Sequence, residues 1–188
     1  MIKSLFSIIV GSEMKVALML LGDVDSDIMG ELKDRVRGIF RCPVETKEHP
    51  NDIAYAYNAQ RKQYLSSKFI AILSKVGREK NEIIAGITDV DLYMPRLNFV
   101  FGEADVLSRT AIVSLCRLRQ EYYGLPPDKD LLLTRATKEV VHELGHTFGL
   151  RHCSNSKCVM RFSNSLADTD WKEVNFCPHC CPSMEFLL

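Results

Sequence analysis

The chain has 188 residues, of which 46% are hydrophobic, and its 24 Lys and Arg residues equal its 24 Asp and Glu residues in number. This length fits one ordinary domain, or one domain with a small appendage, and the apolar fraction is large enough for a buried core. The even charge balance argues against a protein that binds nucleic acid or acidic membranes, because both partners attract an excess of positive charge.

The first residues, MIKSLFSIIVGSEMKVALMLLGDV, are apolar but are interrupted by Gly11, Glu13 and Lys15. No uninterrupted apolar run reaches membrane-spanning length. A signal peptide is the alternative, although no convincing small-x-small cleavage site precedes Met14. We expect residues 1–13 to be an N-terminal extension or a misassigned start, with the first strand beginning after Met14.

The hydrophobic pattern predicts alternating strands and helices in the first part of the chain. We expect strands at 16–21, after Pro43, at 69–73, in the phrases at 83–93 and 98–104, and at 110–118. We expect helices at 25–40, 55–65 and 129–148, and a short one around 168–174. This order indicates an α/β (α+β) fold, in which a mixed sheet with flanking helices is followed by an irregular C-terminal part held by metal.

The helix expected at 129–148 carries the most informative pattern, within the stretch EVVHELGHTFGLRHC. His142 and His146 lie one turn apart on one helix face, so their ring nitrogens can converge on one ion. The opposite stripe is apolar and can pack against a sheet; it consists of Leu133, Val140, Leu144 and Phe148. Glu143 lies beside the first histidine, near the position of a metal-bound water.

Gly149 falls where this helix must end, and a glycine there can turn the chain. The turn would carry His152 back toward the two helical histidines. Three imidazoles leave the fourth position of a zinc ion open for water, as in catalytic rather than structural sites. Three unrelated histidines are the alternative, which the combined spacing disfavours.

Seven cysteines are present, and an odd number excludes complete disulfide pairing. Four of them occur late, in Cys-x4-Cys and Cys-x2-Cys spacing: Cys153, Cys158, Cys177 and Cys180. In a chain without a clear export signal this favours metal binding and a reducing, cytoplasmic setting. Disulfide-bonded or simply reduced cysteines are the alternative.

The pattern His142-Glu-x-x-His146-x-x-Gly149-x-x-His152 resembles the metzincin metallopeptidase signature, and the cysteines that follow make the chain similar to archaemetzincin, a small metzincin-like family. The phrases GITDVDLY at 86–93 and NFVFGEA at 98–104 also look like that family. The resemblance implies a single metzincin-like catalytic domain at 14–188, with an upper part at 14–149 and a zinc-stapled lower part at 150–188. It also implies two zinc ions per chain, one catalytic and one structural.

The structural zinc would be held by the four late cysteines in a closed tetrahedron. His179 and Cys181 are rival ligands, but the Cys-x2-Cys spacing favours Cys177 and Cys180. Met160 resembles the methionine of the Met-turn, which lies beneath the catalytic zinc without binding it. Met184 is its rival by position, and an ordinary core methionine would pack in nearly the same way.

Three further expectations concern single residues and one segment. Cys42 and Cys116 lie among apolar residues and are expected in the core. His49, next to a proline, is expected at the surface. The segment LNFVFGEA could supply an edge strand along which an extended peptide pairs, or it could be an internal strand with Gly102 at a bulge.

These observations lead to one main hypothesis: a zinc-dependent metallopeptidase in which a zinc-activated water attacks the peptide bond and Glu143 is the general base. The expected partner is a peptide or protein substrate, with no nucleic acid and no membrane, and the enzyme is expected to be a monomer. The alternative is a zinc-stabilised binding module with a closed or inactive site. Hydrolysis of a non-peptide amide is a third interpretation.

Overall fold

The protein was analysed as a computed structural model, which describes residues 14–49 and 52–181. The expectation for residues 1–13 and the rival methionine Met184 lie outside these described residues. Within them, no helix is long and apolar enough to cross a membrane.

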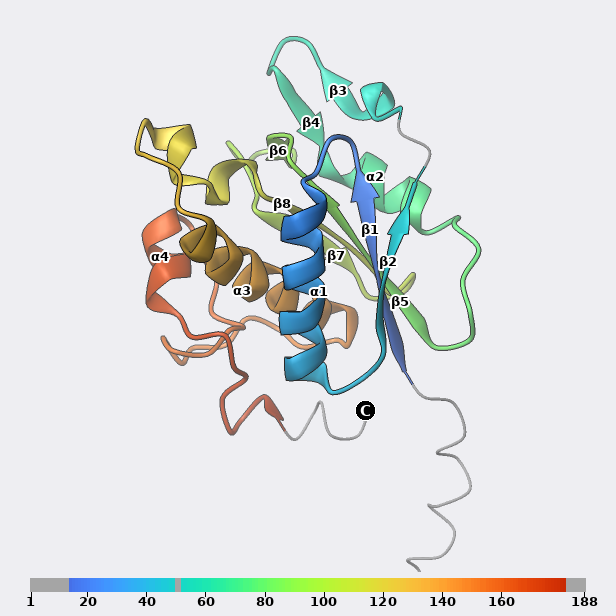
Figure 1. Ribbon diagram of the computed structural model, residues 1–188, viewed down its shortest axis with the longest axis vertical. Helices are drawn as coiled ribbons and strands as arrows, with labels where there is room; N and C mark the ends of the chain where they lie inside the picture. The colour runs from blue at the N-terminus through green and yellow to red at the C-terminus, as the bar shows by residue number, and fades with distance from the viewer. Residues whose placement is uncertain (1–13, 50–51, 182–188) are drawn as a thin grey trace, which may run out of the picture.

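A five-stranded mixed sheet forms the centre of the molecule (Figure 1). Its strand order is β2 (Val44–Glu48), β1 (Lys15–Leu21), β5 (Glu82–Thr88), β8 (Thr110–Ser114) and β7 (Gly102–Asp105). Neighbouring strands are parallel except for β7, which pairs antiparallel with β8 at one edge. The central strands β5 and β8 are buried along their whole length, because helices cover both faces of the sheet.

Side chains of β1 alternate between two cores, as the two-residue period of a strand requires. Val16 and Leu18 pack with α1 (Ser26–Phe40) and α3 (Lys129–Thr147) on one face. Ala17 and Met19 pack with α2 (Ser66–Leu73) on the other. The predicted α/β architecture of a mixed sheet with flanking helices is therefore confirmed. Helix α3 packs against the part of the sheet that contains β8 and the edge strand β7.

Two predicted elements are wrong. The helix expected at 55–65 is a 3₁₀ turn (Ala54–Ala56) followed by the short strands β3 (Tyr57–Asn58) and β4 (Gln63–Leu65). Strand β4 pairs with β3 on one side and with β6 (Leu92–Tyr93) on the other, which makes a second, three-stranded sheet. The strand expected at 69–73 is part of α2, whose buried residues follow helical spacing: Ser66, Phe69, Ile70 and Leu73. A short apolar run such as FIAIL does not by itself distinguish a buried strand from a buried helix.

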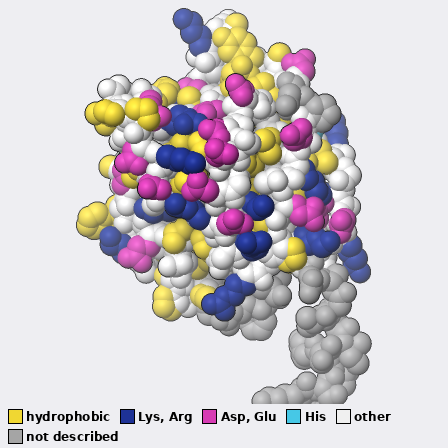
Figure 2. Space-filling view, viewed as in Figure 1, with side chains coloured by type: hydrophobic (Ala, Val, Ile, Leu, Met, Phe, Trp, Pro, Cys, Tyr) yellow, Lys and Arg dark blue, Asp and Glu magenta, His cyan; other side chains and the backbone are white. Residues whose placement is uncertain are grey.

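The predicted ends of other elements also shift. The strand expected at 110–118 stops at Ser114, and a 3₁₀ turn (Cys116–Leu118) follows. The short C-terminal helix is α4 (Leu166–Trp171), which begins earlier than expected because Ser165 and Asp168 form a capping box. Lys, Arg, Asp and Glu side chains are interspersed over the face in Figure 2, in keeping with the balanced composition.

Candidate metal centre

Helix α3 presents one face to the core and the other to a cleft. It begins at Asp128, whose carboxylate accepts a hydrogen bond from the Leu131 N–H at 2.9 Å. Leu133, Val140 and Leu144 are fully buried against the sheet, as predicted. His142 and His146 therefore point toward the cleft side.

The turn after α3 brings the third histidine to the first two. Gly149 has a φ of 85°, which a glycine adopts without strain, and its N–H donates to the His146 carbonyl at 2.8 Å. One ligand nitrogen from each of His142, His146 and His152 lies within 4.8 Å of the others. The three predicted ligands thus meet at one point.

Backbone carbonyls fix the two helical imidazoles. The Nδ1 of His142 lies 2.8 Å from the Val159 carbonyl oxygen, and the Nδ1 of His146 lies 2.7 Å from the Leu150 carbonyl oxygen. Because a carbonyl only accepts, each Nδ1 must carry the proton and donate it. Each Nε2 is then an unprotonated lone-pair donor, the form that binds a metal.

The position of these lone pairs fits a bound cation. The Nε2 atoms of His142 and His146 lie 3.1 Å apart, and two acceptors at this distance repel each other unless a positive ion lies beside both. Two nitrogens of a tetrahedral zinc site are separated by roughly 3.3 Å. Burial also lowers the pKa of all three histidines, His152 included, which favours the neutral, ligating form.

Glu143 is buried and borders the same cleft. Burial, and then the charge of Glu139, raise the pKa of its carboxyl group well above the ordinary value. Gly102 of β7 makes room for it: a Cβ atom on Gly102 would lie 2.6 Å from the Glu143 Cγ and 2.7 Å from its Oε1. Of the two interpretations of this segment, the edge strand agrees with the position of β7, and the contact between Gly102 and Glu143 was not predicted from the sequence.

A buried ion pair beside the centre was also missed. The Lys172 ammonium is fully buried and lies 2.9 Å from Glu139 Oε1, which also accepts a hydrogen bond from the Thr169 hydroxyl at 2.9 Å. Glu139 lines the cleft one turn before Glu143. The only sequence signal for this pair was the four-residue spacing of Glu139 and Glu143 on one helix, because Lys172 comes from a distant part of the chain.

The four late cysteines form a second cluster. Their sulfur atoms lie within 4.8 Å of one another, and the Cys153–Cys177 and Cys158–Cys180 sulfur pairs are each 3.8 Å apart. A disulfide needs about 2.05 Å, so these pairs are not bonded. Sulfurs around a tetrahedral zinc with bonds of about 2.3 Å lie roughly 3.8 Å apart, so the cluster fits zinc.

The thiols of this cluster differ in acidity, because burial raises the pKa of Cys158 and Cys180 above the ordinary value. Burial opposes ionisation of Cys177, but the backbone N–H groups of Cys180 and His179 and the neighbouring thiols lower its pKa to about 6. The thiolate is the form that binds a metal. The rivals His179 and Cys181 are both exposed and lie outside this cluster.

A short segment connects the two clusters. Cys158 belongs to the thiol cluster, while the carbonyl of Val159 accepts the hydrogen bond from His142. Met160 is fully buried, and a Cβ atom on Gly145 would lie 2.4 Å from its sulfur. Three consecutive residues therefore hold the sulfur cluster, orient a histidine and pack beneath the helix between the two histidines.

The other residues noted in the sequence lie away from both clusters. Cys42 and Cys116 are half-buried, not fully buried as expected for core residues. Burial raises the pKa of both thiols to about 11, so they remain protonated at neutral pH. His49 is half-buried and follows β2.

The cleft in front of the histidines has a volume of about 1050 Å³. Residues 97–104 and Val106 form one wall, and α3 with residues 149–152 forms the other. The wall at 102–105 is β7, which pairs with a strand on one side only within the described part of the chain. Its outer edge is therefore open to an extended chain.

Comparisons with known proteins match most of the chain to one family. Residues 21–185 match the family described as Peptidase family M54. The chain is 43% identical over 174 residues to an archaemetzincin of Methanocaldococcus jannaschii, covering 92% of this chain and 93% of that protein. It is 51% identical over 132 residues, 70% of each chain, to an archaemetzincin of Pyrococcus horikoshii.

Two solved structures share the fold. The archaemetzincin of Methanopyrus kandleri superposes with a TM-score of 0.82 at 38% identity, covering 94% of this chain and 96% of that one. A zinc-dependent peptidase from Methanocorpusculum labreanum superposes with a TM-score of 0.82 at 28% identity, covering 90% of this chain and 99% of that one.

Proposed function

We propose a catalytic site for this chain, which belongs to peptidase family M54, the archaemetzincins, and is a zinc metallopeptidase. In this proposal, His142, His146 and His152 hold the zinc ion at which peptide bonds are hydrolysed, and Glu143 is the general base. The observation that carries this proposal is the convergence of three neutral imidazoles on one point in a cleft that Glu143 also borders.

Zinc held by the three histidines would polarise the substrate carbonyl and lower the pKa of a water molecule. Glu143 would take a proton from that water and later deliver it to the leaving amine. Its burial supports this role, because a carboxyl group with a raised pKa holds the transferred proton more readily. The Val159 and Leu150 carbonyls would keep the two helical imidazoles oriented.

We also propose a second, structural zinc on Cys153, Cys158, Cys177 and Cys180, which makes two ions per chain. Four sulfurs leave no open position, so this ion would stabilise the fold rather than react. The spacing of the sulfur atoms supports zinc. The Met160 packing beneath α3 supports a Met-turn and the wider metzincin kinship.

The substrate is a peptide or protein, as for the family, and we propose that it binds as an extended chain along the open edge of β7. Backbone pairing with an edge strand gives affinity with little dependence on sequence. We further propose that the enzyme works as a monomer in a reducing, cytoplasmic setting. The protonated Cys42 and Cys116 thiols are compatible with such a setting.

The Glu143→Gln variant tests the assignment of the base. Glutamine keeps the shape of the side chain but cannot accept a proton, so we expect retained zinc and a loss of turnover of roughly 10²- to 10⁴-fold. Cleavage of a broad peptide library, measured with and without chelator, compares the variant with the wild type. Wild-type turnover by zinc-loaded Glu143→Gln would exclude Glu143 as the base.

A further inference from the structure

A second and shallower cavity, of about 520 Å³, adjoins the catalytic cleft. Asn98 borders both cavities, so one opens beside the other. Polar and charged residues line it: Arg61, Lys62, Gln63, Asp91, Asn98, Arg117 and Tyr122. Three of these side chains are cations and one is a carboxylate, which leaves the lining with an excess of positive charge in a protein whose net charge is zero.

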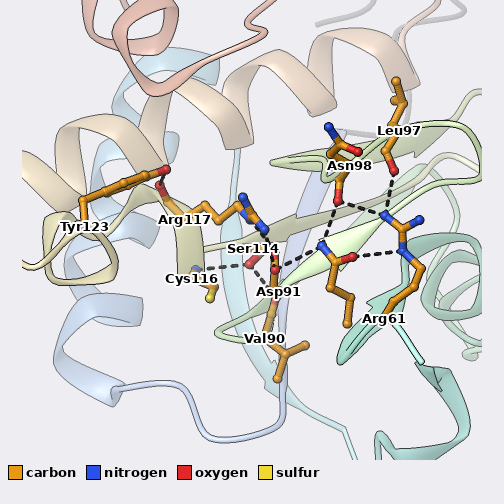
Figure 3. A network of polar contacts seen from close by, with 10 residues as sticks. Arg61, Val90, Asp91, Leu97, Asn98, Ser114, Cys116, Arg117 and Tyr123 are labelled. Carbon is orange, nitrogen blue, oxygen red and sulfur yellow. Dashed lines mark hydrogen bonds and ion pairs between the residues drawn. The ribbon is translucent and has the colours of Figure 1, made fainter. Parts of the chain in front are cut away.

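Arg117 is held rigidly at one side of this cavity (Figure 3). Its Nε and Nη2 donate to the two oxygens of Asp91 at 2.6 and 2.7 Å. Its guanidinium group also lies 4.4 Å from the centre of the Phe99 ring and 4.9 Å from that of Tyr122. A guanidinium that is paired along one edge and packed against aromatic rings is already oriented for a ligand.

Arg61 is held in a comparable way at the other side (Figure 3). Its Nη2 donates to the backbone carbonyls of Leu97 and Asn98 at 2.9 and 3.0 Å, and its Nε donates to Gln63 at 3.0 Å. Among residues 14–49 and 52–181, the Nη1 groups of Arg61 and Arg117 donate no hydrogen bond. Each arginine therefore retains a donor group beside the cavity.

Lys62 adds a third cation, which forms no ion pair with any residue of 14–49 and 52–181. It is exposed, and the lysines that form ion pairs within the described residues are others: Lys15, Lys47, Lys129 and Lys172. The carboxylate of Asp91 is already engaged by Arg117 and by the Gln63 amide at 3.1 Å. The unused donors therefore match a carboxylate that comes from outside the chain.

The position of the cavity relates it to the reaction centre. Glu143 lies against Gly102, and Asn98 precedes Gly102 by four residues on the same wall of the cleft. Residues 98–101 precede β7 and are not part of a strand, so the four residues span at most about 13 Å, the length of a fully extended segment. In an antiparallel pairing with β7, the part of the substrate that follows the cleaved bond would run toward Asn98.

We propose that this cavity binds a carboxylate of the peptide substrate, within about four residues beyond the cleaved bond on the C-terminal side. The carboxylate belongs to an acidic side chain or to the C-terminus of the substrate, which present the same chemistry. The proposal rests on the proposed peptidase function, because it assigns a substrate position relative to the same cleft.

The test uses zinc-loaded, full-length enzyme and internally quenched peptides with Glu or Gln at each position after the cleaved bond. Each peptide is made with a free and with an amidated C-terminus, which separates the two sources of the carboxylate. We expect kcat/KM to be about tenfold higher for Glu than for Gln at one of these positions, or for the free acid than for the amide. The preference should shrink as salt is raised, because the cavity is open to solvent.

The Lys62→Glu variant should bring this preference close to one or reverse it. Lys80→Glu is the matched control, since Lys80 is exposed and precedes β5 at the end away from Asp91, and it should keep the wild-type preference. Equal rates for all paired peptides with the wild type, or an unchanged preference in Lys62→Glu, would overturn the proposal.

A binding assay separates this proposal from the proposed peptidase function. Fluorescently labelled peptides of the same series are titrated into zinc-loaded Glu143→Gln protein, with and without Lys62→Glu. A preference for the carboxylate in binding supports the cavity even if the wild type cleaves none of the peptides. An absence of any such preference in binding overturns the cavity assignment even if cleavage is efficient.

Discussion

Gly102 shows how a single residue without a side chain can control the position of a reacting group. The Glu143 side chain occupies the space in which any Cβ atom at position 102 would lie. The same Cβ atom would also lie 2.8 Å from the Ile112 carbonyl oxygen. A methyl group there has no free volume, so either the strand or the carboxylate must move.

Gly102→Ala should therefore lower kcat by at least about tenfold while zinc remains bound, because small displacements of a general base are costly to the reaction. Gly30→Ala is the control, since a Cβ at Gly30 meets no atom within 4 Å. Steady-state kinetics and zinc content of both variants provide the measurement. A Gly102→Ala enzyme with the wild-type kcat would show that the packing of Gly102 against Glu143 has no catalytic importance.

At this scale the sequence predicted the histidines and cysteines that meet in the structure, because each belongs to a short motif of metal-binding residues, although the first cysteines of the two pairs lie 24 positions apart. It could not predict contacts between distant residues that belong to no such motif. Lys172 reaches Glu139 across 33 positions of the chain, and nothing in the neighbouring letters marks either residue as one half of a buried pair. Gly102 likewise owes its importance to a helix forty residues later.

The segment that follows α3 links the histidine cluster and the cysteine cluster through one short piece of backbone. Cys153 donates its N–H to the Met160 carbonyl at 2.9 Å, and Val159 accepts from His142 at 2.8 Å. Loss of the sulfur cluster would release the carbonyl that orients the first histidine. Loss of a group that hydrogen-bonds to a metal-binding histidine typically lowers metal affinity by 10- to 100-fold.

Cys158→Ser should therefore remove the structural zinc and also weaken zinc binding at the three-histidine centre by about 10- to 100-fold. Competition with a chromophoric chelator measures the affinity, and Cys116→Ser, whose thiol lies outside the cluster, is the control. If Cys158→Ser bound zinc at the histidines as tightly as the wild type, the two centres would be energetically independent.

Element by element, the sequence was most informative where a pattern was long. Helix α3 has nineteen residues, a capping aspartate and an apolar stripe, so its prediction was correct to within one residue at its C-terminal end. The segments between 54 and 73 are short, and tertiary contacts decide their conformation. Pairing of β4 with β6, which is distant in the chain, converts an expected helix into strands.

On the scale of the whole molecule, the sheet and α3 form the cleft, and residues 149–152 and 162–164, which follow α3, also line it. Strand β7 provides one wall, and α3 provides the proposed base and two of the three histidines. The thiol cluster brings Cys153 and Cys158, which follow α3, together with Cys177 and Cys180. If both clusters bind zinc as proposed, the ion at the histidines would react, and the ion at the cysteines would hold the segment that orients His142.

Zinc per chain, measured by mass spectrometry on protein purified from rich medium, tests this account most directly. We expect two zinc ions in the wild type, and one ion with no peptide cleavage in His146→Ala, whose thiol cluster remains intact. One zinc or none in the wild type, or peptide cleavage by His146→Ala, would contradict the account of one catalytic and one structural zinc.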